Sequence, residues 1–236
     1  MPARFSLRML RTERPPQGDE TLREADKGEY DGYMIYDLAT LSGPLLKLGE
    51  IDSGAQKWMA EAETGKILGR WRADIGTLGR IILLREFDTQ QALMEERRRA
   101  LLCRNPFNGN GIVSQISQET YEGFSFLPPA KPRVAGGVYE FRTYFLKPGG
   151  LPPTLEGWRE AIKPAKDYTD HLIINMFALD GPPRITHIWG FNSVQQRFDL
   201  RERHYAAGLW PPKGGPEQIE HATSTIALSN EGSPLS

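Results

Sequence analysis

Short runs in which apolar or aromatic residues alternate with polar ones occur throughout the chain, and glycine or proline bounds many of them. This period of two is typical of β-strands. It predicts strands over residues 33–41, 66–73, 80–87, 112–126, 137–146, 171–178, 184–191 and 219–228. Helical spacing of apolar residues predicts helices over residues 52–63, 89–103, 154–166 and 193–207. The chain therefore mixes short strands with helices, as an α+β protein does.

The order strand, helix, strand, strand, helix, strand occurs twice. Tyr36 corresponds to Tyr139 at an offset of 103, and Phe87 corresponds to Phe191 at an offset of 104. This βαββαβ order is that of the ferredoxin-like unit. Because a sheet with helices on one face leaves its other face open, two such sheets are expected to bury those faces against each other. The sequence predicts two ferredoxin-like βαββαβ units that form an intrachain pseudo-dimeric α+β barrel.

The tandem repeat divides the chain into four predicted parts. These are an N-terminal arm over 1–32, a first unit over 33–128, a proline-rich linker over 129–136 and a second unit over 137–236.

Composition narrows the classes of function. Lys and Arg number 29 against 30 Asp and Glu, a balance that argues against a protein that coats nucleic acid. No window approaches the ~18 consecutive apolar residues of a spanning helix, so no integral membrane segment is expected. Cys103 is the single cysteine, which indicates a reducing compartment. We expect a cytoplasmic protein; the arginines at 4, 8, 11 and 14 leave the mitochondrial matrix as the alternative.

Alternation along 138–145 separates two faces of one strand. One face carries Tyr139, Phe141, Thr143 and Phe145 and is expected to lie under helices, since it is the more apolar. The other face is expected to point between the two sheets. Together with the strand at 184–191, it predicts a pocket lined by Glu140, Arg142, Tyr144, His187 and Trp189.

These residue types suit a small-molecule site. His187 would act as a general acid or base, because its ordinary pKa of about 6.5 suits proton transfer near neutrality. Arg142 would hold an enolate or carboxylate, Tyr144 would donate a hydrogen bond and Trp189 would stack on a planar ligand, with Glu140 beside them. The alternative is structural: Glu140 and Arg142 pair as ions, Trp189 belongs to the core and His187 is a hydrogen-bonded core histidine.

The second helix of each unit carries a further repeated stripe. Its members are spaced as one face of a helix: Gln90, Met94, Arg97 and Leu101, then Val194, Phe198, Arg201 and Tyr205. We expect both stripes to be buried, with each arginine snorkelling or paired with a carboxylate. Asp88 and Asn192 are the expected N-caps.

The segment Val138-Tyr-Glu-Phe-Arg-Thr-Tyr-Phe-Leu-Lys-Pro-Gly149 resembles the opening strand of the NIPSNAP family, and His187-Ile-Trp-Gly-Phe191 resembles its His-x-Trp-x-aromatic element. Ser233-Pro234 also suits the end of the family's domain. The resemblance covers residues 137–236. The first unit, 33–128, resembles a diverged copy, since its first strand lacks the Arg and Leu83 and Arg85 replace the His and Trp.

The resemblance implies the same dimeric α+β barrel and little about function. Family members in animals are associated with mitochondria and adaptor roles, and related barrels include cofactor-free monooxygenases, polyketide cyclases and haem enzymes. Three hypotheses follow: a pocket for a small molecule, with or without cofactor-free catalysis; a non-catalytic scaffold that presents Trp210 or Phe107 to a protein partner or a second copy; and haem bound through His171 or His187. The sequence shows no metal-binding or nucleotide-binding motif, so no metal and no cofactor are expected.

Overall fold

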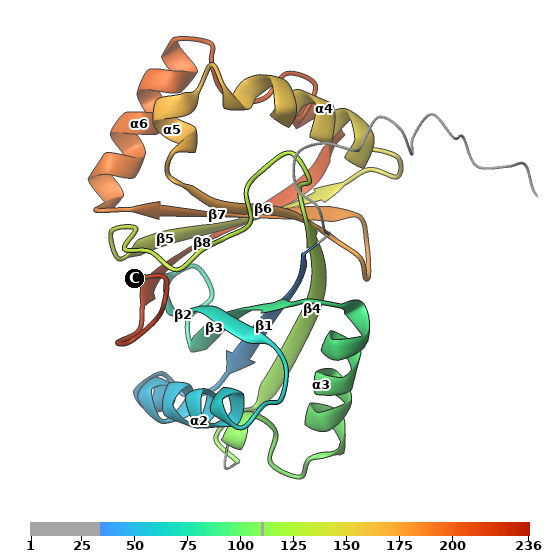
Figure 1. The fold of residues 1–236 in the computed structure, drawn as a ribbon. Helices are drawn as coiled ribbons and strands as arrows, with labels where there is room; N and C mark the ends of the chain where they lie inside the picture. The colour runs from blue at the N-terminus through green and yellow to red at the C-terminus, as the bar shows by residue number, and fades with distance from the viewer. Residues whose placement is uncertain (1–33, 110) are drawn as a thin grey trace, which may run out of the picture.

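Eight antiparallel strands close into one barrel in the computed structural model, which describes residues 34–109 and 111–236 (Figure 1). Around the barrel the strands follow the order β1-β3-β2-β8-β5-β7-β6-β4, and β4 pairs again with β1. The predicted arm over 1–32 lies outside the described residues. The predicted fold class, two ferredoxin-like units in one intrachain barrel, is confirmed.

The N-terminal half supplies four neighbouring strands and two helices. Its elements are β1 (Ile35–Ser42), the 3-10 turn η1 (Leu45–Lys47), α2 (Leu48–Ala60), β2 (Lys66–Ile75), β3 (Arg80–Phe87), α3 (Gln90–Leu102), the 3-10 turn η2 (Pro106–Asn108) and β4 (Gln115–Gly123). Both helices lie on the outer face of this part of the barrel, at the bottom of Figure 1.

The C-terminal half repeats this order with one extra short helix. Its elements are β5 (Val138–Leu146), α4 (Leu151–Ile162), α5 (Lys166–Thr169), β6 (Leu172–Ala178), β7 (Arg184–Phe191), α6 (Val194–Ala206), the 3-10 turn η3 (Pro216–Gln218) and β8 (Ile219–Ser229). Its helices cover the opposite outer face, at the top of Figure 1.

Two strand pairs join the halves. β4 pairs with β6, with Tyr121 opposite Ala178, and β2 pairs with β8, with Trp71 opposite Ser229. The segment predicted as a linker, 129–136, connects β4 to β5 and packs on the barrel: Ala130 is buried in its core, and Arg133 bridges to Leu235 near the C-terminus.

Element boundaries differ slightly from the predicted ones. α2 and α4 each begin three or four residues earlier than expected, at Leu48 and Leu151. The N-caps of α3 and α6 are Thr89 and Ser193, whose hydroxyls accept from the amides of the third helical residue. The expected caps, Asp88 and Asn192, lie one residue too early, because serine and threonine after them offer the same oxygen at the right position. None of the described helices is long and apolar enough to cross a membrane.

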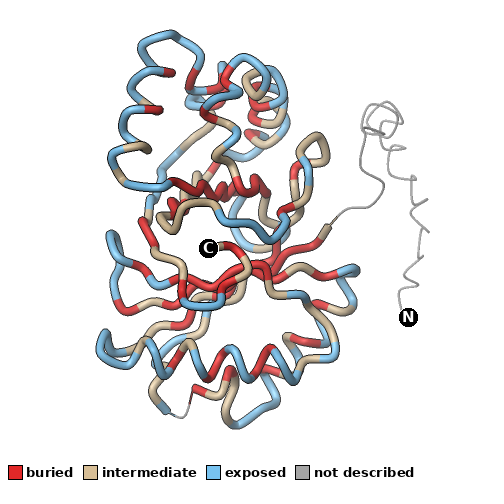
Figure 2. The backbone as a smooth tube through the Cα atoms, turned by 60° about the vertical axis from the view of Figure 1, so that its left-hand side comes forward, coloured by how far each residue is buried: buried red, intermediate tan, exposed pale blue. Residues whose placement is uncertain are grey.

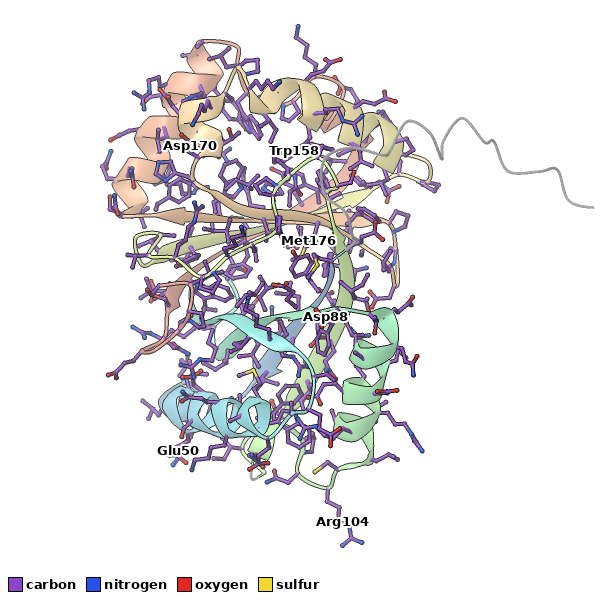
Figure 3. The ribbon with its side chains drawn as sticks, viewed as in Figure 1. Glu50, Asp88, Arg104, Trp158, Asp170 and Met176 are labelled. Atoms are coloured by element: carbon purple, nitrogen blue, oxygen red, sulfur yellow. The ribbon has the colours of Figure 1, made fainter. Side chains whose placement is uncertain are left out.

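The two faces of the strands are the reverse of the sequence prediction. Tyr139, Phe141 and Ile188 pack in the barrel interior together with Tyr36 and Leu38 of the other half. Figure 3 shows Met176, a member of the same cluster, between the two sheets, whereas Trp158 lies between α4 and the sheet. Strands such as β1, β3 and β7 are buried along nearly their whole length and so on both faces (Figure 2), which is why the more apolar face could not be assigned to the helices by polarity alone.

The polar face lies under the helices of the C-terminal half. Tyr144 and Trp189 pack there with Trp158 of α4 and Leu200 of α6. The charged members of this face are accommodated because α6 brings Arg197 onto Glu140. The pocket that the sequence predicted between the two sheets is therefore on the outer face of the barrel.

Candidate functional site

A pocket of about 330 Å³ lies between the sheet of the C-terminal half and its helices. Strands β5, β7 and β8 form its floor, α4 and α6 form its sides, and the segment after α6 covers it. The lining residues are Arg142, Tyr144, Leu146, Thr154, Trp158, Ile185, Tyr205, Trp210, Pro211, Pro212, Gly215, Pro216, Ile219 and Ala222. This volume lies at the lower end of the range of ligand pockets, roughly 300 to 1,000 Å³.

The cover of the pocket is the segment that leaves α6 and returns to β8. Gly208 and Gly214 adopt positive φ values of 65° and 75°, which side chains disfavour and which turn the chain back over the sheet. Between them, Trp210 is buried and packs edge-on against Trp158, with 4.9 Å between ring centroids. An aromatic contact thus holds the cover on α4.

Arg142 stands on the floor of the pocket. On β5 it lies between His187 of β7 and Ser224 of β8. Its side chain is 13% exposed, and Nε lies 3.0 Å from Oε1 of Glu140. Neither Nε nor Nη1 of Arg142 makes a hydrogen bond to any described residue. Arg142 is therefore a largely buried guanidinium, with Nε and Nη1 shielded from solvent, whose charge is only partly matched.

Glu140 is fully occupied by other donors. Arg197 of α6 donates from Nε to Oε2 at 2.8 Å and from Nη2 to Oε1 at 2.5 Å, and Ser224 donates to Oε1 at 2.9 Å. Burial raises the pKa of this carboxyl, but the hydrogen bonds from Arg197 and the charge of Arg142 outweigh burial and lower it overall. Glu140 is therefore ionised, and Arg197 is its main partner.

His187 is a buried neutral side chain, only 1% exposed. Trp189 donates from its indole Nε1 to Nδ1 of His187 at 2.6 Å. Since an indole N–H can only donate, Nδ1 must accept, and the proton of the neutral ring is on Nε2. Burial, then the charges of Arg142 and Arg201, hold the pKa of His187 well below its ordinary value. This arrangement favours a hydrogen-bond donor at Nε2 over the proton acceptor predicted from the sequence.

The ring of His187 lies directly behind two aromatic rings of the pocket. Its centroid is 4.9 Å from that of Tyr144 and 5.2 Å from that of Trp158, both edge-on. Trp189 itself does not line the pocket: it stacks on Tyr168 at 4.4 Å and is fully buried. The structure thus brings all five predicted residues together, with Arg142 and Tyr144 at the pocket and Glu140, His187 and Trp189 behind it.

Several pocket residues were missed by the sequence analysis. Trp158 and Trp210 were visible as tryptophans in a matched helix and beside a Pro-Pro pair, but nothing in the sequence placed them opposite one strand face. Tyr205 was assigned to a buried stripe. In the structure Tyr205 is 42% exposed and Phe198 of the same stripe is 56% exposed. That prediction was wrong because α6 buries Leu200 and His204, a face turned by about one residue from the predicted stripe.

The residues proposed for the other hypotheses have structural partners. Trp210 and Phe107, the expected docking residues, are both buried. Nδ1 of His171 lies 3.0 Å from the carbonyl oxygen of Gly190, and its ring stacks on Phe191. No group of three His, Cys, Asp or Glu side chains that could hold a metal ion occurs in the part of the chain that the structure describes.

Comparison with known proteins identifies the C-terminal half. A family model described as NIPSNAP matches residues 139–234. Protein NipSnap homolog 2 of Danio rerio is 27% identical over 135 residues, which are 54% of this chain and 45% of that protein. The matched part thus spans less than half of this curated relative.

Solved structures show a similar fold over most of the chain. A "putative monooxygenase" from Lactobacillus acidophilus NCFM aligns with a TM-score of 0.60 and 12% identity, over 85% of this chain and 98% of that one. An anthrone oxidase-like protein aligns with a TM-score of 0.59 and 11% identity, over 86% and 94%. These likenesses concern the fold. Through the domain at residues 139–234, the chain belongs to the NIPSNAP family.

Proposed function

We propose that this protein binds a small organic molecule in the pocket of its C-terminal half. The observation that carries the proposal is the composition of the pocket, where apolar and aromatic walls surround a single arginine, Arg142, whose charge is only partly matched. Ligand pockets typically combine mostly apolar walls with a few polar groups that orient the ligand. A charge buried without full pairing costs free energy, so a retained one points to a role beyond stability.

A more specific version of this proposal is that the pocket also catalyses a reaction without a cofactor. The arrangement suits stabilisation of negative charge that develops on a bound carbonyl, because Arg142 is a fixed cation at the floor. It offers no base at His187, whose Nδ1 already accepts from Trp189. The similarity in fold to a protein named as an anthrone oxidase-like protein is compatible with such a site and assigns no reaction to it.

A non-catalytic scaffold is the second candidate function, but the residues that would contact a partner differ from those that the sequence suggested. Trp210 and Phe107 are buried, whereas Leu101 and Leu102 at the end of α3 are exposed. A homo-oligomer and a cytoplasmic location stay predictions from the sequence.

Native mass spectrometry of the gently purified protein tests the binding function. We expect a co-purifying small molecule that denaturation releases and that Arg142→Met loses. Arg203→Met removes the same charge from an exposed site on α6 and should keep the ligand. A protein without bound molecules, which also fails to bind any member of an aromatic acid, amide and amine library, would count against the function.

A further inference from the structure

The charges around the pocket do not balance. Three guanidinium groups, those of Arg142, Arg197 and Arg201, act on Tyr144 or His187 at the floor of the pocket, and the carboxylate of Glu140 pairs with two of them, Arg142 and Arg197. Arg197 uses both oxygens of Glu140. Arg142 reaches Glu140 through Nε without hydrogen-bond geometry. The site therefore carries excess positive charge, since His187 is neutral.

Arg201 is the second arginine with spare capacity. Its Nη1 is buried and has no hydrogen-bond partner within residues 34–109 and 111–236. Its Nη2 donates to the hydroxyl of Tyr205 at 3.1 Å. The Tyr205 oxygen thus accepts a charged donor, which leaves its own proton for another acceptor. Since Tyr205 lines the pocket, the bond from Arg201 favours this hydroxyl as a donor to a ligand that reaches it.

The remaining walls are apolar and suit a flat body. Trp158 and Trp210 stand edge-on to each other at one side, and Ile185 and Ile219 lie on the floor. Pro211, Pro212 and Pro216 form the cover and offer no backbone N–H donor. Apart from Tyr144 and Thr154, whose hydroxyl already donates to the carbonyl of Gly150, polar recognition is thus concentrated at Arg142 and Tyr205, and the rest of the lining is apolar.

We propose that the ligand is a flat apolar acid whose anionic group binds Arg142 and the hydroxyl of Tyr205, with its ring system packed against the side that Trp158 and Trp210 form. This inference rests on the proposed function and names its ligand class. Arg142 and Tyr205 both act as donors, so a ligand that presents an acceptor oxyanion completes them. A cationic ligand meets two arginines that are only partly paired and is disfavoured, and a neutral one leaves their charge without a further partner.

Three probes with the same flat body and different charge test the ligand class. These are 2-naphthoate, 2-naphthamide and 2-naphthylmethylamine, and their binding to the full chain is measured by isothermal titration calorimetry. We expect 2-naphthoate to bind at least about tenfold more tightly than 2-naphthamide, because a charge-assisted hydrogen bond replaces a neutral one. The ammonium probe should bind weakest. A fourth probe, 2-naphthyl phosphate, distinguishes a carboxylate from a phosphate as the preferred anion.

Variants assign the preference to its residues. Arg142→Met should remove the difference between naphthoate and naphthamide, and Tyr205→Phe should reduce it about threefold through loss of one hydrogen bond. Arg203→Met, which removes an exposed guanidinium from the same helix, should keep the full preference, so a loss in this control would assign the effect to net charge alone.

The outcomes separate the two proposals. Equal or tighter binding of the amide or the amine in the wild-type protein overturns the acid as ligand class and leaves the pocket as a binding site. A preference for the acid that survives in Arg142→Met also overturns it. Absence of binding for all four probes, together with no co-purifying molecule, overturns the pocket function itself.

Discussion

In the N-terminal half, the space between the sheet and its helices is filled by an apolar cluster together with a network of charged side chains, whereas the same space in the C-terminal half is partly hollow and lined by aromatic rings. In the filled half, Arg85 donates to Asp37 and to Glu96, both at 2.7 Å. Arg97 adds a bond to Asp37 at 3.0 Å, and Arg99 adds one to Glu96 at 2.6 Å. Every carboxylate of this network is buried and paired.

Strand register shows which residues correspond in the two halves. Asp37 of β1 lies opposite Arg85 of β3, and Glu140 of β5 lies opposite Trp189 of β7. Two residues further along each pair of strands, Ala39 lies opposite Leu83, and Arg142 lies opposite His187. The two arginines therefore differ in strand and in position: Arg85 lies on β3 opposite the carboxylate of Asp37, whereas Arg142 lies on β5 opposite the neutral His187.

The outer wall of each space follows a common plan. In each half, the first helix supplies a tryptophan that contacts a buried aromatic residue placed after the second helix: Trp58 with Phe107 at 5.7 Å, and Trp158 with Trp210 at 4.9 Å. In the N-terminal half, Trp58 also donates to Glu96 at 3.0 Å. The same frame thus closes around an ion network in one half and around a pocket in the other.

Arg85 and Arg142 differ in how completely their charge is paired. A buried ion network is most stable when its members find their partners, and in the N-terminal half Arg85 does so with all three guanidinium nitrogens, whereas Nε of Arg97 has no hydrogen-bond partner among the described residues. The same fold can therefore satisfy an arginine in this layer. Arg142, with partly matched charge at a pocket, is best explained by a ligand.

The largest expected effect is the collapse of the ion network. Arg85→Met leaves Asp37 and Glu96 with fewer partners in a buried site, where loss of one member typically costs about 3 to 5 kcal/mol. Urea unfolding at pH 7 measures the change in the free energy of unfolding. Arg98→Met, on the exposed side of α3, should change it by less than about 0.5 kcal/mol. A loss below about 1 kcal/mol for Arg85→Met would show that the network is not a structural unit.

Acid should weaken both halves, and by less than Arg85→Met, because a protonated carboxyl still accepts a hydrogen bond from its arginine. For Glu96, burial raises the pKa, but hydrogen bonds from Arg99 and Arg85 lower it overall; the pKa of Glu140 is also lowered. Both carboxyls are therefore less basic in the folded state than in the unfolded chain. Their contribution is complete above the unfolded pKa of about 4.3 and is lost as pH falls through the folded value.

Glutamine variants assign this acid loss to each half. Urea unfolding between pH 7 and pH 3 should show a shallower fall in stability for Glu96→Gln and for Glu140→Gln than for the wild type. Glu95→Gln, at an exposed position of α3, should keep the wild-type slope. Unchanged slopes in the first two variants would contradict the assignment.

The sequence predicted the order of strands and helices and the barrel, but it did not predict which face of each strand lies in the barrel interior. Strand and helix order follows from periods of two and 3.6 residues, and the barrel follows from two sheets with open faces. The side of each strand did not follow, because Tyr139 and Phe141 in the interior are as apolar as residues that lie under helices. The deciding contact, Arg197 with Glu140, joins residues 57 positions apart.

Alternation along the strand grouped the candidate residues on one face, and the structure turns that face toward the helices instead of toward the other sheet. Glu140, Arg142 and Tyr144 do share a face, since alternation fixes that relation whichever way the strand is turned. The cover of the pocket could not be predicted, because Trp210 reaches Trp158 only through the path of a loop. The orientation of His187 depends on one hydrogen bond from Trp189. Because the two residues are two positions apart on one face of the strand, this bond is possible, but the sequence does not require it.

The hydrogen bond from Trp189 to His187 should have a measurable share in stability. Trp189→Phe leaves Nδ1 of His187 buried without its donor, which costs about 1 to 3 kcal/mol beyond the loss of ring volume. Trp71→Phe is the matched control: Trp71 is equally buried, and its Nε1 has no hydrogen-bond partner in the described part of the chain. Urea unfolding should show the larger loss for Trp189→Phe. Nitrogen-15 NMR should find His187 neutral with its proton on Nε2 in the wild type; a proton on Nδ1 would contradict the donor assignment.

The smallest expected effect on stability comes from the residue with the largest expected role in binding. Arg142→Met replaces a partly matched buried charge with an apolar side chain of similar length, and Glu140 keeps Arg197 and Ser224 as partners. Such replacements are often neutral, so the free energy of unfolding should change by less than about 1 kcal/mol in either direction. Urea unfolding of the ligand-free protein measures this beside Arg85→Met, the same chemical change in the other half. A loss of about 3 kcal/mol or more at both positions would mean that Arg142 is a structural ion like Arg85, and the distinction between a filled half and a binding half would fail.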